Sequence, residues 1–315
     1  MKMKKTRLMN RLEEKAHYYN IKTGGPQEAI TKELLHYDIL QTLSSMGVFQ
    51  DGVTFQGGTA LRLCYGGRRY SEDLDFATGH DFNFDRLNDL STRLTDYLST
   101  SYGLECTVTP PKHDIDQEKG GVQVAAWKLS VSMDPARKDI PKQRIWIEFA
   151  NVRALTKELR PFISNFEQEA GQHMLIAVET PQEIFADKIL AAANRPRVKA
   201  RDIFDLKFLS DRNITLDPAH VVEKLKDYKV TDHDAFLDRL DKYRLDLTGE
   251  AFRASWLDEM TRFTNPDLRQ VLLSNEFYDS MAAQLDRVLG QASDDIKAAL
   301  GMEPDEPKLT NKFRL

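Results

Sequence analysis

The chain has 315 residues, of which 41% are hydrophobic and 30% are charged, and this globular composition supplies enough apolar material for one large domain or two smaller ones. Its 44 basic and 49 acidic residues give a formal net charge of −5, so the charge of the whole chain indicates neither a nucleic-acid nor a membrane partner. Cys64 and Cys106 form no disulfide framework and no CxxC metal pair, which is typical of a reducing cytosol. Because no apolar run suits a signal peptide or a spanning helix, we expect a soluble cytoplasmic protein.

The first half of the chain predicts one helix followed mainly by short strands. Apolar residues recur at helical spacing over 27–46, and a second helix is expected over 84–98. The predicted strands are 53–55, 73–76, 104–108, 122–133, 144–152 and 173–178. A polar loop joins 122–133 to 144–152, so these two strands are expected to form an antiparallel hairpin.

Beyond residue 180 the sequence has helical spacing throughout. Thr180, Pro181 and Glu183 form a helix start signal in which Glu183 can close a capping box, and Asp217 precedes a proline in a second such signal. Further helices are expected at 235–245, 250–260, 275–289 and 294–300. The predicted fold class is therefore α+β, with a sheet and flanking helices in residues 1–170 and a helical C-terminal domain in residues 171–315.

Two acids on one strand need a counter-charge. Side chains alternate along a strand, so Asp73 and Asp75 share one face while Leu74 and Phe76 face the core. A divalent metal is the simplest partner, since Mg²⁺ is usually held by one or two carboxylates together with substrate phosphates. The alternative is a solvated edge strand whose acids pair with nearby basic residues.

A glycine turn precedes this strand. Gly57, Gly58 and Thr59 stand between a short strand and a helical segment, where backbone N–H groups and a helix N-terminus are available to an anion. Glycines let the backbone approach a phosphate closely because they lack a Cβ. A glycine pair alone is most often only a turn, but followed by paired aspartates it favours metal-assisted phosphoryl or nucleotidyl transfer.

Charged residues also lie on the packing faces of two predicted helices. Lys188 falls within the apolar arc of the helix that begins at Pro181, so it extends to solvent, pairs with an acid or reaches into a cleft. On the next helix Asp202 and Asp205 share a stripe with leucines. Four cations in seven residues separate the two helices, and they suit either a solvated loop or a phosphate-rich ligand. These cations are Arg195, Arg197, Lys199 and Arg201.

Aromatic and acidic residues of the strands are less informative. Glu148 alternates with the apolar residues of its strand and therefore faces away from them, which fits either a third metal ligand or an exposed glutamate. Trp127, Tyr65 and Tyr70 are able to stack on a base, but we expect them in the core or at its rim.

The segment from Gly57 to Leu63 and the pattern RxSEDLDF from Arg69 to Phe76 resemble the signature of the AbiEii/AbiGii abortive-infection toxin family. These are nucleotidyltransferase-fold toxins of bacterial toxin–antitoxin and phage-defence systems. The resemblance extends to residues 33–40 and 188–209. It implies a nucleotidyltransferase-like mixed sheet and an NTP-dependent nucleotidyltransferase.

The resemblance also implies roles for particular residues. Asp73 and Asp75, with Glu148 from a later strand, would hold Mg²⁺ or Mn²⁺. Lys188 and Asp202 would be functional, although Asp205 fits the same motif and the choice between the two acids stays open. The expected nucleotide-binding residues are Gly57, Gly58, Thr59, Arg69 and Ser71.

The implied reaction moves a nucleoside monophosphate from an NTP to an RNA, with the 3′ end of tRNA as the favoured acceptor, and so arrests growth. The RNA backbone is expected on the loop from Arg195 to Arg201. A cognate antitoxin protein is the expected partner, and no membrane partner is expected. Transfer to a protein hydroxyl and a non-catalytic module that binds NTP or antitoxin are the alternatives.

Overall fold

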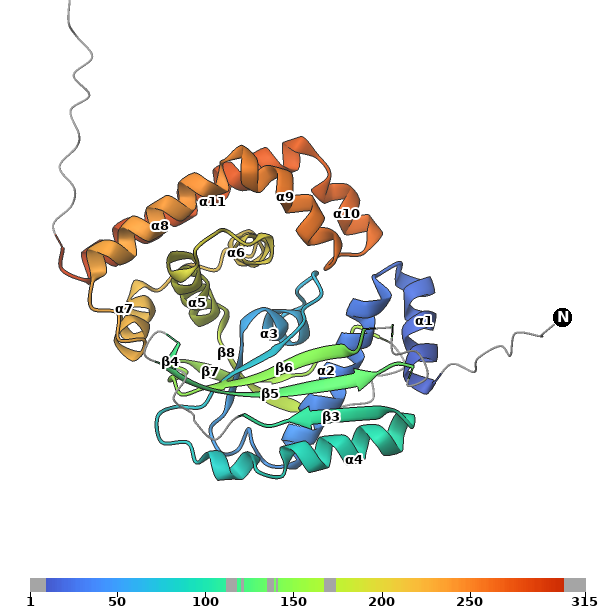
Figure 1. The fold of residues 1–315 in the computed structure, drawn as a ribbon. Helices are drawn as coiled ribbons and strands as arrows, with labels where there is room; N and C mark the ends of the chain where they lie inside the picture. The colour runs from blue at the N-terminus through green and yellow to red at the C-terminus, as the bar shows by residue number, and fades with distance from the viewer. Residues whose placement is uncertain are drawn as a thin grey trace, which may run out of the picture.

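A mixed sheet forms the centre of the computed structural model, which describes residues 10–111, 118–119, 122–134, 139, 141–166 and 174–302 (Figure 1). Its strand order is β3-β5-β6-β2-β1-β8-β7, and β4 pairs with β5 outside this path. The strands are β1 (Thr54–Gln56), β2 (Leu74–Ala77), β3 (Glu105–Thr109), β4 (Glu118–Lys119), β5 (Val122–Ser132), β6 (Gln143–Ala150), β7 (Lys157–Pro161) and β8 (Leu175–Glu179). The pairs β2–β6 and β1–β8 are parallel, and the others are antiparallel. The predicted α+β class with a mixed sheet is confirmed.

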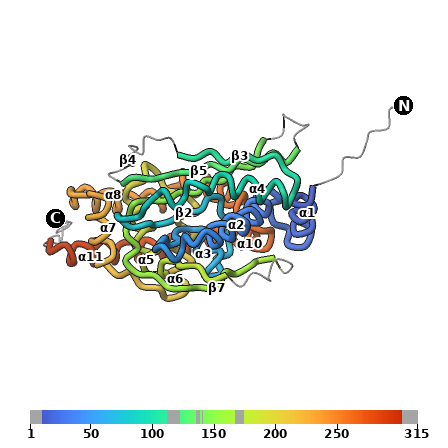
Figure 2. Tube along the Cα trace, turned by 90° about the horizontal axis from the view of Figure 1, so that it is seen from below, coloured from blue at the N-terminus to red at the C-terminus, as the bar shows by residue number. Residues whose placement is uncertain are grey.

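Helices cover both faces of this sheet (Figures 1 and 2). The helices of the first half are α1 (Arg11–Thr23), α2 (Gln27–Ser45), α3 (Gly57–Cys64) and α4 (Leu90–Tyr102), with a 3₁₀ turn η1 (Phe84–Leu87) before α4. The long helix α2 and α4 cover the face on which Ile147 and Phe149 are buried, and α3 lies on the opposite face. The apolar core lies between the sheet and α2 on one face and continues through α3 and the later helices on the other.

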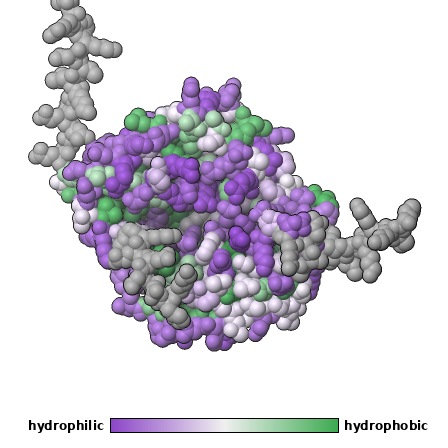
Figure 3. Space-filling view, in the orientation of Figure 1, coloured by the Kyte–Doolittle hydropathy of each residue, from purple (hydrophilic) through white to green (hydrophobic). Residues whose placement is uncertain are grey.

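The remaining helices stand over the α3 face and extend away from the sheet (Figure 1). They are α5 (Pro181–Asn194), α6 (Ala200–Asp211), α7 (Pro218–Asp227), α8 (His233–Leu247), α9 (Glu250–Thr261), α10 (Pro266–Leu272) and α11 (Asn275–Ala299). In the space-filling view the surface is hollowed between the sheet and these helices, and hydrophilic residues gather there (Figure 3). Among the described helices, none combines the length and the apolar character that crossing a membrane requires.

Several boundaries differ from the sequence predictions for identifiable reasons. The two helices expected at 275–289 and 294–300 are one helix, because small and apolar residues continue the buried face through Ala292 and Ile296. Strand β7 was not predicted, since it is an edge strand without a fully buried residue. The start signal at Thr180 is confirmed as a side-chain cap, but Glu183 does not close a capping box and instead accepts backbone N–H bonds from Leu155 and Thr156.

Two further predictions from the sequence concern the loop between β5 and β6 and the division of the chain into two domains. The polar loop expected between β5 and β6 lies mostly outside the described residues, while the two strands do pair as the expected antiparallel hairpin. The division into residues 1–170 and 171–315 stays a prediction. Strand β8, which that division assigns to the second part, pairs with β1 and β7 inside the sheet.

A buried lysine joins the helical part to the sheet. Lys224 of α7 is 1% exposed, and its Nζ lies 3.2 Å from Glu179 Oε1, 2.8 Å from Glu183 Oε1 and 2.7 Å from Asp187 Oδ1. Burial and the neighbouring charge of Asp187 raise the pKa of Glu179 well above its usual range. One cation thus connects the end of β8, helix α5 and helix α7.

Replacing Lys224 by Met should destabilise the protein, because the buried Glu179 and Glu183 and the partly exposed Asp187 lose their common cation. Removing one partner of a buried ion pair typically costs about 3–5 kcal/mol. Lys226→Met on the same helix is the matched control, since Lys226 is largely exposed and pairs with Glu223 at the surface. Urea unfolding measures both free energies, and equal losses in the two variants would contradict the assigned role of Lys224.

Candidate functional site

Three carboxylates lie together on the α3 face of the sheet. Asp73 precedes β2 and Asp75 lies within it, while Leu74 and Phe76 are fully buried on the other face, as the alternation predicts. Strand β2 pairs with β6 in parallel, and the register places Asp75 beside Glu148. Sequence reasoning selected all three residues, and the sheet brings them to neighbouring positions.

The charges of this group are only partly balanced by the protein. Burial, followed by the negative charges of Glu148 and Asp73, raises the pKa of Asp75 to about 7. Burial also raises the pKa of Asp73, although a hydrogen bond of 2.9 Å from the Trp146 backbone N–H to Asp73 Oδ1 opposes this shift. The negative charge of these carboxylates is therefore only partly compensated by other groups of the protein.

A divalent cation fits this donor set. Among the described residues, no group of three or more His, Cys, Asp or Glu side chains is arranged as a complete metal site. Carboxylate oxygens are nevertheless the ligands that Mg²⁺ prefers, and Mg²⁺ usually takes only one or two of them and completes its shell with water and substrate phosphates. The incompletely balanced pair Asp73 and Asp75 suits a cation that binds together with its substrate.

The glycine turn packs against charged side chains. Gly57 has φ +79°, a left-handed conformation, and a Cβ there would lie 3.0 Å from Asp75 Oδ2. At Gly58 a Cβ would lie 2.1 Å from Arg69 Nη2, which is an overlap. The Thr59 hydroxyl donates to the Asp73 carbonyl oxygen. Gly57 and Thr59 therefore lie against the acidic strand and Gly58 leaves room for Arg69, packing roles that the sequence alone did not indicate.

Arg69 is directed away from solvent and holds helix α6. Its guanidinium is buried and forms a two-point ion pair with Asp205, with Nε 2.6 Å from Oδ1 and Nη2 2.5 Å from Oδ2. Burial raises the pKa of Asp205, but Arg69 and then Lys188 outweigh it and hold that pKa below its usual range. The predicted nucleotide-binding residue thus has a protein partner in this structure.

Lys188 does not extend to solvent. It is buried, and its Nζ lies 2.6 Å from Asp205 Oδ2 and 3.2 Å from Asp202 Oδ1. Arg195 is the second cation on Asp202. Both acids of the motif therefore contact Lys188, and they differ in their second partner, which is Arg69 for Asp205 and Arg195 for Asp202.

Glu72 directly precedes Asp73 in the sequence and forms ion pairs with three cations. The sequence alone did not indicate this role. Lys32 Nζ lies 3.0 Å and Arg262 Nη2 3.3 Å from its Oε1, and Arg201 Nη1 lies 3.4 Å from its Oε2. Burial raises the pKa of Glu72, but the hydrogen bond from Lys32 and the nearby cations outweigh it and lower that pKa. Ser71 lines a small neighbouring pocket beside Lys32 and Glu72.

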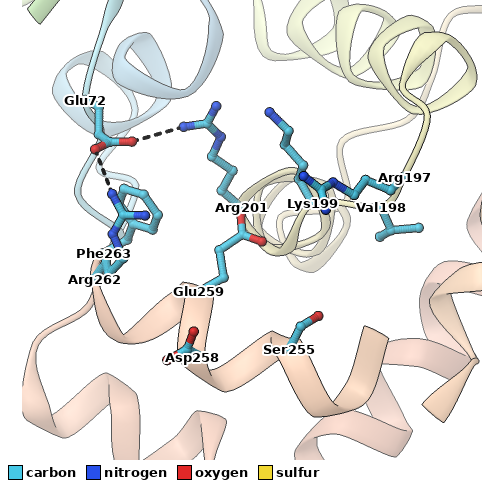
Figure 4. A pocket seen from close by; sticks show the side chains of 10 residues that line it. All are labelled: Glu72, Arg197, Val198, Lys199, Arg201, Ser255, Asp258, Glu259, Arg262 and Phe263. Carbon is cyan, nitrogen blue, oxygen red and sulfur yellow. Dashed lines mark hydrogen bonds and ion pairs between the residues drawn. The ribbon is translucent and has the colours of Figure 1, made fainter. Parts of the chain in front are cut away.

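The two central cations of the basic loop line a separate pocket. Arg195 pairs with Asp202 and Arg201 with Glu72, while Arg197 and Lys199, together with Arg201, border a cavity of about 480 Å³ (Figure 4). The other lining residues are Glu72, Val198, Arg201, Ser255, Asp258, Glu259, Arg262 and Phe263. Burial, then Arg195 and Arg201, lower the pKa of Lys199. Cations crowded in this way favour a bound anion.

The chain is similar to a known protein family and, in its fold, to a solved structure. A family model described as "Nucleotidyl transferase AbiEii toxin, Type IV TA system" matches residues 38–299. The solved structure of MenT4, a nucleotidyltransferase toxin from Mycobacterium tuberculosis, is similar with a TM-score of 0.51 and 19% identity over 90% of this chain and 97% of that chain. A putative nucleotidyltransferase from H. pylori has a TM-score of 0.44 and 18% identity over 87% of this chain and 98% of that chain. No curated protein matches the sequence.

The raised pKa of Asp75 predicts a stability effect in metal-free protein. The folded state keeps the Asp75 proton up to about pH 7, whereas an unfolded aspartate loses it near pH 3.8. The contribution of Asp75 to stability is therefore full below the lower pKa and is lost as pH rises through the higher one. Asp75→Asn should raise the melting temperature more at about pH 8 than at about pH 5, because at pH 5 only part of this stability has been lost.

Thermal unfolding at these two pH values measures the effect, and the exposed Asp81→Asn is the matched control. A shift that is the same at both pH values would contradict the raised pKa.

Proposed function

The chain belongs to the AbiEii family of nucleotidyl transferase toxins from type IV toxin–antitoxin systems, and on that premise we propose that it moves a nucleoside monophosphate from an NTP to an RNA acceptor. The favoured acceptor is the 3′ end of tRNA. The observation that supports this proposal is the pair Asp73 and Asp75, placed between the glycine turn and Glu148 with its negative charge only partly balanced.

The carboxylates would bind the metal that the reaction needs. Asp73 and Asp75, with Glu148 at the neighbouring strand position, are the residues that would hold Mg²⁺ or Mn²⁺. When bound, such an ion stabilises the charge that develops on the attacking and leaving oxygens. In the reaction an acceptor hydroxyl oxygen would bond to the α-phosphorus, the bond to the pyrophosphate oxygen would break to release pyrophosphate, and the hydroxyl proton would pass to solvent.

Positive side chains near the carboxylates would orient the phosphates. The Lys188 ammonium has three donors, and Asp202 and Asp205 are its two acidic partners. Lys188 also lies near enough to Asp75 to oppose the rise of its pKa. We assign Lys188 to the triphosphate, with Asp202 and Asp205 as the residues that hold the lysine in place.

The pocket lined by Arg197 and Lys199 is the proposed position of the RNA backbone. The chain as a whole is acidic, so RNA binding has to depend on a local cluster of cations. Arg201 and Arg262 bring the cations that line this pocket to four (Figure 4). Acidic residues of the same pocket, Asp258 and Glu259, would limit the number of phosphates that bind there.

Blocked tRNA charging would explain growth arrest, and a cytoplasmic site of action follows from this choice of acceptor. We propose that a cognate antitoxin protein prevents arrest in the uninfected cell and that release of the activity contributes to phage defence. These roles rest on the family to which the chain belongs.

Replacing Asp73 or Asp75 by Asn keeps the shape of the side chain but removes charge that the metal needs. Each variant should lose NMP transfer by about two or more orders of magnitude, as removal of a principal charge-stabilising group does. The measurement is transfer of label from NTP radiolabelled at the α-phosphate, together with growth arrest in cells. Asp89→Asn, an exposed aspartate before α4, is the control. Undiminished transfer in either variant would remove that residue from the site.

The salt dependence of RNA binding tests the basic pocket. Each phosphate contact contributes about −0.7 to −0.9 to the slope of log affinity against log salt. The double variant Arg197→Ala with Lys199→Ala should flatten this slope by about one to two units and change NTP binding much less. Arg86→Ala with Arg93→Ala removes equal charge from the region before and within α4, on the other face of the sheet, and should leave the slope unchanged. An unchanged slope in the pocket variant would exclude Arg197 and Lys199 from RNA binding.

A further inference from the structure

An exposed indole lies on the same sheet face as the carboxylates. Trp146 of β6 is 40% exposed, whereas Trp127 and Trp256, which complete the three tryptophans of the chain, are 4% and 2% exposed. On β6 the alternate residues Ile145 and Ile147 are buried in the core, so Trp146 points to the α3 face. An aromatic ring of this size usually contributes its area to a core or an interface.

The sheet register places Trp146 between the acidic strand and a lysine. Its backbone N–H donates to Asp73 Oδ1 over 2.9 Å. On its other side, β5 pairs with β6 so that Lys128 is directly opposite Trp146, and Lys128 Nζ lies 5.7 Å from the centroid of the ring. Neighbouring strands are about 4.8 Å apart, so the indole stands within the length of one nucleotide from Asp73.

Carboxylate, indole and ammonium thus lie in a row across β2, β6 and β5. A nucleotide has complementary parts, because its phosphates need the cation that the carboxylates attract and its base offers a flat aromatic surface. Stacking of a base on an aromatic side chain tolerates every base, since each has a π-face. A lysine beside the ring adds a cation that also favours the electron-rich face of a base.

We propose that Trp146, with Lys128 beside it, is a stacking platform for a nucleobase bound at the carboxylate site. The base belongs either to the NTP or to the terminal nucleotide of the acceptor, and both present the same flat surface. This inference rests on the proposed function for the position of the phosphates. The other aromatic residues considered from the sequence are less suitable, because Trp127 and Tyr70 are buried and the Tyr65 hydroxyl is held by Glu158 and the Glu179 carbonyl oxygen.

Tryptophan fluorescence of the unmodified protein tests the platform directly. Stacking of a base on Trp146 should quench its emission, while the two buried tryptophans should respond little. The probes are each of the four NTPs, inorganic triphosphate, which has no base, and a short single-stranded RNA, all with Mg²⁺ present. We expect quenching by NTP or by RNA and none by inorganic triphosphate. Trp146→Phe should keep the binding and lose the quenching.

The affinity of the same probes tests the energetic role. Trp146→Ala should weaken binding of the base-containing probe by about 5-fold to 150-fold, as removal of a stacked aromatic residue does, and leave inorganic triphosphate binding unchanged. Trp146→Phe should largely restore the affinity. The matched control is Leu159→Ala, which removes an exposed apolar side chain from the edge strand β7.

The pattern of losses identifies the source of the base. A loss confined to NTP assigns the platform to the incoming nucleotide, and a loss confined to RNA assigns it to the acceptor. Absence of quenching by both probes, or affinities of Trp146→Ala equal to those of the unmodified protein, would overturn the proposal. These binding measurements do not depend on NMP transfer. Quenching of Trp146 emission without any NMP transfer would therefore support the stacking platform and contradict the proposed reaction.

Discussion

The buried ion-pair network around Asp205 determines how the two halves of the site meet. Arg69 comes from the segment before the acidic strand, and Lys188 and Asp205 come from helices α5 and α6. Because Arg69 lies against Gly58, the same contact that attaches α6 also requires glycine at the start of α3. The position of Lys188 beside the carboxylates is therefore coupled to the conformation of the glycine turn.

The charges are distributed unequally between the helices and the sheet. On the helices, Asp202 and Asp205 each form ion pairs with two cations. Their charges are therefore balanced within the protein, which suits a role in positioning Lys188. On the sheet, burial and then the negative charges of Glu148 and Asp73 raise the pKa of Asp75, because the cations near it do not compensate for them. Free protein is consequently destabilised by the same carboxylates that a metal and a triphosphate would neutralise, a common compromise between stability and activity.

Local sequence patterns predicted the parts of the site that depend on neighbouring residues. Alternation placed Asp73 and Asp75 on one face, and helical spacing placed Lys188 on a packing face. The partners across the fold were not accessible in this way, because Arg69 and Asp205 are 136 residues apart. Helix α1, which was not among the predicted elements, begins with a capping box formed by Asn10 and Glu13. The place of Trp146 beside Asp73 depends on the parallel pairing of β2 with β6 and could not be predicted from its own strand.

The central claim is that NMP is transferred to the 3′ end of an RNA. Purified protein, NTP radiolabelled at the α-phosphate and Mg²⁺ should be incubated with total RNA and total protein of a bacterial cell, and then with the same RNA after periodate oxidation of its 3′ ends. The account predicts label in small RNA of tRNA size and its loss after oxidation. Label in protein, label that survives oxidation, or no label in either fraction would contradict it.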